Sequence, residues 1–160
     1  MGSRLLSDAH PLLAEKVRAL MAEYARRFAP WRLVITSVWR SPLEQEALYA
    51  QGRVSQAELN LARARAGMAP IRDADEAARV VTKTRNSRHN SIPAEAVDLA
   101  VAIDPDGEDG PVKPRIDWHT ASRYEAMGEM AKRLGLAWGG DWKQRDLCHV
   151  ELSRDAEDSV

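Results

Sequence analysis

Hydrophobic and polar positions follow two different periods along the chain, one of three to four residues and one of two. The longer period runs from Leu13 to Phe28, with charged residues between the apolar ones. This pattern is typical of an amphipathic helix with one buried face. We expect Ser7 or Asp8 to cap the start of this helix and Pro30 to end it.

The helical period returns in later parts of the chain. Residues 41–52 predict a short helix, with Ser41 at its cap and Gly52 beyond its end. Residues 117–135 predict a second long amphipathic helix that a glycine closes. Between these two, residues 55–79 are rich in Ala, Arg and Glu, and they predict a helical or mobile insertion.

Apolar, β-branched and aromatic residues predict strands over residues 31–39, 95–104 and 147–152. Successive side chains of a strand point to opposite faces. The middle strand would therefore turn its larger apolar residues to the core and Asp98 to a face of alanines, which leaves open space for a bound group. Helices and strands are mixed without βαβ alternation, so we expect an α+β domain with a small, largely antiparallel sheet flanked by helices.

Length and charge fit one globular domain over residues 1–160, with its core over 10–152 and a polar tail over 153–160. The formal net charge of −1 gives no general attraction to nucleic acid or anionic lipid. No apolar run approaches the ~18 residues that a membrane span needs. We therefore expect a soluble monomer without nucleic-acid partners and without membrane insertion.

Three titratable residues interrupt or border the apolar strands: His89, Asp98 and His149. Aspartate is rare in strands, and a buried carboxylate needs a partner to offset its desolvation. An arginine or backbone N–H groups could satisfy Asp98. Two imidazoles and one carboxylate also make a three-ligand zinc site with a fourth position open to water, which is the catalytic pattern.

The single cysteine, Cys148, raises a different possibility, a cysteine–histidine dyad with His149. Strand alternation turns these neighbouring side chains to opposite faces, which argues against the dyad. One cysteine also excludes an internal disulfide and argues against a cysteine-rich structural zinc site.

The stretch "SRHNSIPAEAVDL", followed by "WGGDWKQRDLCHVEL", resembles the zinc-dependent LAS peptidases of the M15 family. That family includes D-alanyl-D-alanine dipeptidases and carboxypeptidases and the L-alanyl-D-glutamate peptidases of phage endolysins. Upstream, "TSVWRSPLEQEALYAQGR" resembles the family's arginine-containing block, so the likeness covers residues 10–152. It implies a fold like that of hedgehog domains and DD-peptidases. The spacer between the first histidine and the aspartate is two residues longer than the common form, which predicts an expanded loop around Pro93.

The resemblance implies a role for each residue that matches a motif. The zinc ligands would be His89, Asp98 and His149. Bound zinc would lower the pKa of a water molecule toward ~7, and Asp146 would be the general base that takes its proton and passes it to the leaving amine. Arg40 would bind a substrate carboxylate or stabilise the oxyanion, and Ser87 would line the substrate site. Apart from the resemblance, Trp138 and Trp142 flank "GGD", and we expect them either to shape the wall of the substrate site or to pack in the core.

The position of Asp146 leaves an alternative for the base. Residues three apart in a regular strand point to opposite faces, so Asp146 and His149 can both reach a metal only if a turn lies near Arg145. Glu151 is in phase with His149 and is the rival base, although a supporting or solvent-facing role suits it better.

The implied function is hydrolysis of peptidoglycan stem peptides. An aspartate as base, where the dipeptidases have glutamate, favours the L-Ala–D-Glu endopeptidases of bacteriolytic endolysins. The alternatives are a D-Ala–D-Ala dipeptidase or carboxypeptidase, and a hedgehog-like module that binds zinc without turnover. Arg40 and Asp146 favour an enzyme, because a binding module needs neither. Since no export signal is recognisable, we expect accumulation in the host bacterial cytoplasm before release to the cell wall.

Overall fold

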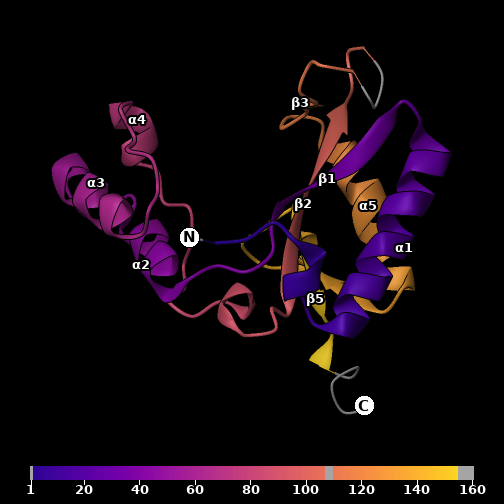
Figure 1. Ribbon diagram of the computed structural model, residues 1–160, viewed down its shortest axis with the longest axis horizontal. Coiled ribbons are helices and arrows are strands. Elements are labelled where there is room, and N and C mark those ends of the chain that lie inside the picture. Colours follow the sequence, from indigo (N-terminus) through magenta and orange to yellow (C-terminus); the bar gives the residue numbers. More distant parts are fainter. Residues whose placement is uncertain (1, 107–109, 155–160) are drawn as a thin grey trace.

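The computed structural model describes residues 2–106 and 110–154. Two halves are visible in Figure 1: a sheet with two long helices beside it, and a lobe of shorter helices on the other side. The part of the expected polar tail beyond residue 154 lies outside the described residues. No helix in the described ranges is long and apolar enough to cross a membrane.

The sheet has five strands, in the order β1–β2–β5–β4, with β3 paired to the end of β2. All of these pairings are antiparallel. The strands are β1 (Trp31–Ser37), β2 (Ala96–Ile103), β3 (Arg115–Ile116), β4 (Leu136–Trp138) and β5 (His149–Leu152). The predicted α+β architecture is thus confirmed, and the short strands β3 and β4 are additions to the three predicted ones.

Two long helices, α1 (Pro11–Phe28) and α5 (Ala121–Arg133), pack against the sheet and against each other (Figure 1). Both confirm the predicted amphipathic segments, and their apolar faces form one core with the larger side chains of β2. Gly135, with φ +81°, ends the α5 segment in the left-handed region that favours glycine.

The start of α1 differs from the prediction. Ser7 and Asp8 lie in a separate 3₁₀ turn, η1 (Leu6–Asp8). Because Pro11 occupies the first turn of α1, the cap falls on His10, whose Nδ1 accepts a hydrogen bond from the Leu12 N–H at 3.2 Å.

The face of alanines on β2 is also not what the sequence predicted. Ala96, Ala100 and Ala102 are fully buried, and Asp98 is the one β2 residue that lines the cleft described below. Each alanine stands opposite a longer side chain on the same face of the sheet, since its cross-strand partners are Glu151, Val34 and Arg32. The prediction that they form open floor for a bound group is therefore wrong.

The lobe consists of α2 (Pro42–Ala50), α3 (Gln56–Arg65) and α4 (Ala74–Ala77). Ser41 caps α2 as predicted, accepting from the Glu44 N–H at 3.1 Å. Residues 55–79, predicted as a helical or mobile insertion, contain α3 and α4 and are therefore partly helical. The fully buried Leu59 and the amide of Gln51, which donates to the Glu76 carbonyl at 2.8 Å, hold the lobe together.

Candidate active site

A cleft of about 410 Å³ lies where the lobe meets the sheet. Its lining includes all the residues predicted for the site, namely Arg40, Ser87, His89, Asp98, Trp142, Asp146 and His149. They come from well-separated stretches of the sequence, so the fold brings them together.

His89 is held by a short 3₁₀ turn, η2 (Arg88–Asn90), just before β2. Ser87 caps this turn, because its hydroxyl accepts a hydrogen bond from the His89 N–H at 3.2 Å. The predicted expanded loop follows, with Ile92 84% exposed, and it closes where the Glu95 N–H donates to the Arg88 carbonyl at 3.0 Å. The longer spacer therefore bulges outward while its two ends stay together.

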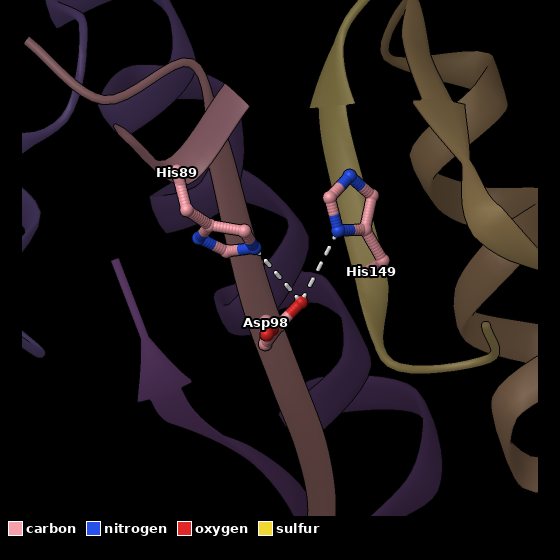
Figure 2. Close-up of side chains that lie close together, drawn as sticks. All are labelled: His89, Asp98 and His149. Atoms are coloured by element: carbon pink, nitrogen blue, oxygen red, sulfur yellow. Dashed lines mark hydrogen bonds and ion pairs between the residues drawn. The ribbon is translucent and has the colours of Figure 1, made fainter. Parts of the chain in front are cut away.

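The three candidate metal ligands converge on one point (Figure 2). Asp98 on β2 and His149 on β5 are direct cross-strand partners. The Asp98 Oδ1 lies 3.2 Å from the His89 Nε2 and 3.3 Å from the His149 Nδ1. One donor atom from each residue lies within 4.8 Å of the others. A tetrahedral zinc site with bonds of about 2.0–2.2 Å spaces its donor atoms about 3.3–3.6 Å apart.

The second nitrogen of each imidazole is already bonded elsewhere. The His89 Nδ1 lies 2.7 Å from the Val38 carbonyl oxygen, and the His149 Nε2 lies 2.8 Å from a Glu151 oxygen. A carbonyl or a carboxylate can only accept, so each of these nitrogens carries the hydrogen. In the neutral tautomers, both remaining nitrogens then present lone pairs to Asp98.

Lone pairs that face a carboxylate need protons or a cation between them. Burial opposes charge on His149, but its hydrogen bonds to Asp98 and Glu151 raise its pKa to about 9. Burial likewise opposes charge on Asp98, whose pKa is nevertheless held well below its usual range by hydrogen bonds to His149 and His89. One divalent cation can take the place of both protons, so the donor set fits a metal ion with three protein ligands.

Asp146 reaches the cleft through a turn. The sequence placed residues 147 and 148 in the last strand, but β5 begins at His149, and Leu147 and Cys148 form a turn. The His149 N–H donates to the Asp146 carbonyl at 3.3 Å across it. The turn that the sequence required near Arg145 thus lies at residues 147–148, and it allows Asp146 and His149 to line the same cleft. Desolvation, and then the charge of Asp98, raise the pKa of the Asp146 carboxyl.

Glu151, the rival base, is committed to other contacts. One of its oxygens bonds the His149 Nε2, and the other lies 3.6 Å from the Arg88 guanidinium. A carboxylate that bonds the second nitrogen of a metal-bound histidine fixes the ring and its tautomer. This contact favours the supporting role for Glu151 over the role of base.

Arg40 lies beside the candidate ligands. Its Nη2 donates to the Asp98 Oδ2 at 3.2 Å, and its Nη1 donates to the Gln45 Oε1 at 3.0 Å. Gln45 is fully buried and also donates to the Thr84 carbonyl at 2.7 Å. An arginine thus partners one oxygen of Asp98, as the sequence allowed, while the other oxygen still faces both imidazoles.

The two tryptophans around "GGD" have separate roles. Trp138 is 4% exposed and packs in the core, whereas Trp142 is 41% exposed and its ring centroid lies 4.7 Å from that of His149. Cys148 packs at the edge of the core, and burial raises the pKa of its thiol to about 12. Because a nucleophilic cysteine acts as its thiolate, this cysteine does not suit a catalytic dyad.

Sequence reasoning missed several groups that support the site. No sequence pattern could indicate the Val38 carbonyl, because every residue has one. Gln45 carried a weak signal, as a polar residue one helical turn after the cap of α2. The threonines of residues 82–84 line the cleft only because the chain returns there from the lobe.

Comparison with known proteins places this architecture among peptidases. The profile of a family described as D-alanyl-D-alanine carboxypeptidase matches residues 81–152, which contain all three candidate ligands. The peptidoglycan L-alanyl-D-glutamate endopeptidase CwlK of Bacillus subtilis (strain 168) is 32% identical over 153 residues, covering 91% of this chain and 74% of CwlK. The crystal structure of the Serratia marcescens L-Ala D-Glu endopeptidase ChiX matches with a TM-score of 0.52 and 20% identity, over 98% of this chain and 92% of that chain, and it supports the fold.

Proposed function

The chain belongs to the M15 peptidase family, and on that premise we propose that it is a zinc-dependent peptidase that cleaves the L-Ala–D-Glu bond of peptidoglycan stem peptides. The observation that carries the proposal is the convergence of His89, Asp98 and His149, with the outer nitrogen of each imidazole already bonded. The choice of bond is supported by the similarity to CwlK, whose name states that activity.

Three atoms would hold the zinc ion: His89 Nε2, Asp98 Oδ1 and His149 Nδ1. A zinc ion bound by three protein ligands supplies Lewis acidity and makes water a nucleophile near neutral pH. The Val38 carbonyl and Glu151 keep the two rings in the tautomers that this binding needs.

The proton transfers fall to Asp146, because its carboxylate lines the cleft with the three ligands. It would take the proton of the attacking water and deliver it to the nitrogen of the leaving D-Glu. Arg40 would donate from its guanidinium to the oxygen on which negative charge develops, or to a substrate carboxylate. Gln45 holds that guanidinium in place through the bond to its Nη1.

Purified zinc-loaded protein incubated with muropeptides, with products read by mass spectrometry, tests the proposal. A new N-terminal D-Glu supports the endopeptidase. Released D-Ala instead indicates the dipeptidase or carboxypeptidase, and zinc binding without any cleavage indicates a hedgehog-like binding module.

The lytic role of the endolysin type, the monomeric state and accumulation in the host cytoplasm stay predictions from the sequence. Lysis of bacteria from within, compared between the native chain and Asp146→Asn, tests the first. Sedimentation of the purified protein tests the second, and fractionation of unlysed producing cells tests the third.

A further inference from the structure

A second hollow of about 600 Å³ adjoins the catalytic cleft. The two share the residues on their common border, namely Val81, Thr82, Thr84, Trp142 and Asp146. They are therefore direct neighbours, and a peptide that extends from the cleft past Asp146 would run toward the hollow. Nothing in the proposed mechanism uses the residues on its far walls.

The hollow is lined by more positive than negative charge. Lys83 comes from the segment that returns from the lobe, and Lys143 comes from the loop before β5. Neither lysine forms a hydrogen bond or an ion pair within the described part of the chain. Arg145 also lines the hollow but pairs with Glu125 at 3.5 Å. Among the described lining residues, the only carboxylate is that of Asp146.

Apolar side chains stand between these cations. Val80, Val81 and Trp142 line the hollow and are 46%, 40% and 41% exposed. Exposed large apolar side chains that gather in a concave place mark contact with a ligand. Apolar walls with two unpaired ammonium groups suit a short aliphatic chain that carries carboxylates.

The position of Asp146 gives the direction of the substrate. In the proposed mechanism Asp146 hands its proton to the leaving nitrogen, so the part of the substrate released as the amine lies beside it. That part begins with D-Glu, which continues through its side-chain carboxyl and keeps its α-carboxylate free. We propose that the hollow is a binding subsite for the acidic, amine-side portion of the stem peptide, in which Lys83 and Lys143 pair with its carboxylates.

This inference rests on the proposed function, and it makes a claim about charge that cleavage alone does not test. The decisive comparison uses two peptides that differ in one group, L-Ala–D-Glu stem peptide with a free α-carboxylate and the same peptide with that group as an amide. The variant is Lys83→Ala/Lys143→Ala, and the matched control is Lys113→Ala, which removes an exposed lysine away from both hollows.

The native protein should prefer the free acid, and the ratio of kcat/KM for acid over amide should fall about tenfold in the double variant, since two exposed ion pairs together contribute about that factor at low salt. The change should lie in KM, and Lys113→Ala should keep the native ratio. An equal loss on both peptides, or a native ratio in the double variant, would overturn the inference.

A binding measurement separates the inference from the proposed function. The amine product, a peptide with N-terminal D-Glu, is titrated by calorimetry into the zinc-loaded native protein and the double variant, again in acid and amide forms. If the double variant binds the acid form more weakly than the native protein does, and the amide form equally well, the subsite is supported. This holds even if no muropeptide is cleaved, a result that would contradict only the cleavage proposal. Equal binding of both forms by the native protein overturns the subsite whatever the turnover.

Discussion

The two halves that meet at the cleft are stabilised in different ways. The sheet half has a continuous apolar core, in which α1 packs on β1 and on α5, and α5 packs on β2 and β4. The lobe of α2, α3 and α4 contributes no described residue to that core, and two of its buried side chains are the amides of Gln45 and Gln51.

This difference in packing corresponds to a difference in the roles that the two halves have at the site. Two candidate zinc ligands, Asp98 and His149, are cross-strand partners inside the sheet half, where close packing restricts movement. The walls that face a substrate come from α2, the returning segment 81–88 and the loop before β5. The first two depend on a few hydrogen bonds, such as that from Gln45 to Thr84. We therefore expect the sheet to fix the metal, and the lobe with its return segment to form one of the walls that hold the substrate.

The largest effect is expected from the ligands themselves. His89→Ala and His149→Ala should each lose stoichiometric zinc and all measurable turnover, because two ligands rarely hold a catalytic zinc ion. Metal analysis after dialysis and a muropeptide assay check this. His119→Ala is the matched control, an exposed histidine outside the cleft that should change neither. Full zinc retention in both ligand variants would contradict the assignment.

Asp146→Asn should keep zinc and fold but lower kcat by about 10²–10⁴-fold, because it removes the proton acceptor and leaves the ligands in place. The same assays on Glu151→Gln distinguish the two carboxylates. If Glu151→Gln abolishes turnover at full zinc occupancy while Asp146→Asn does not, Glu151 is the base.

Matched truncations compare the two halves directly. Leu99 on β2 and Leu59 on α3 are both fully buried. Each change to alanine should lower the stability of the half that contains it by about 2–5 kcal/mol. Leu99→Ala should lower the free energy of global unfolding and weaken zinc binding. Leu59→Ala should mainly raise KM, because it loosens the lobe. Chemical denaturation, zinc titration and steady-state kinetics are the measurements. An equal loss of zinc affinity in both variants would contradict the proposal that only the sheet half supports the metal site.

A smaller effect on zinc affinity is expected from Glu151, which bonds the His149 nitrogen that faces away from Asp98. Glu151→Ala should weaken zinc affinity about 10–100-fold, because His149 then loses the partner that fixes its tautomer. Competition with a chromophoric chelator measures this. Native affinity in the variant would show that the contact does not orient the ring.

The smallest effect is a dependence on alkaline pH, which belongs to the sheet half alone. Burial raises the pKa of both Tyr24 and Tyr124 from 10 to about 12. The tyrosines of the unfolded chain therefore ionise at lower pH than those of the folded protein. The resulting stabilisation of the folded state is complete below pH 10 and is lost as pH rises toward 12, on the order of 2 kcal/mol for each tyrosine. Denaturant unfolding between pH 9 and 12 should show the decline, and Tyr24→Phe should reduce it.

Sequence periodicity predicted the elements whose pattern is local. The helices α1, α2 and α5 and the central strand β2 follow from apolar spacing, caps and terminal glycines. Periodicity failed where contacts between distant segments determine the structure. Ala100 is buried opposite the longer Val34 of β1, and the two-residue β3 is too short to show a period.

The candidate site shows the same limit. The residue types of His89, Asp98 and His149 and the order of their motifs indicated a metal site, and the structure brings the three together. The partners that orient them, such as the Val38 carbonyl, come from parts of the chain far away in sequence and carry no pattern of their own.

The central claim is that His89, Asp98 and His149 hold one catalytic zinc ion. Zinc-edge X-ray absorption of the protein loaded with one equivalent of zinc tests it most directly. The structure predicts two imidazoles and further oxygen ligands without sulfur, and the loss of one imidazole in the residual spectrum of His149→Ala. A sulfur ligand, which Cys148 would have to provide, or fewer than two imidazoles in the native protein, would contradict it.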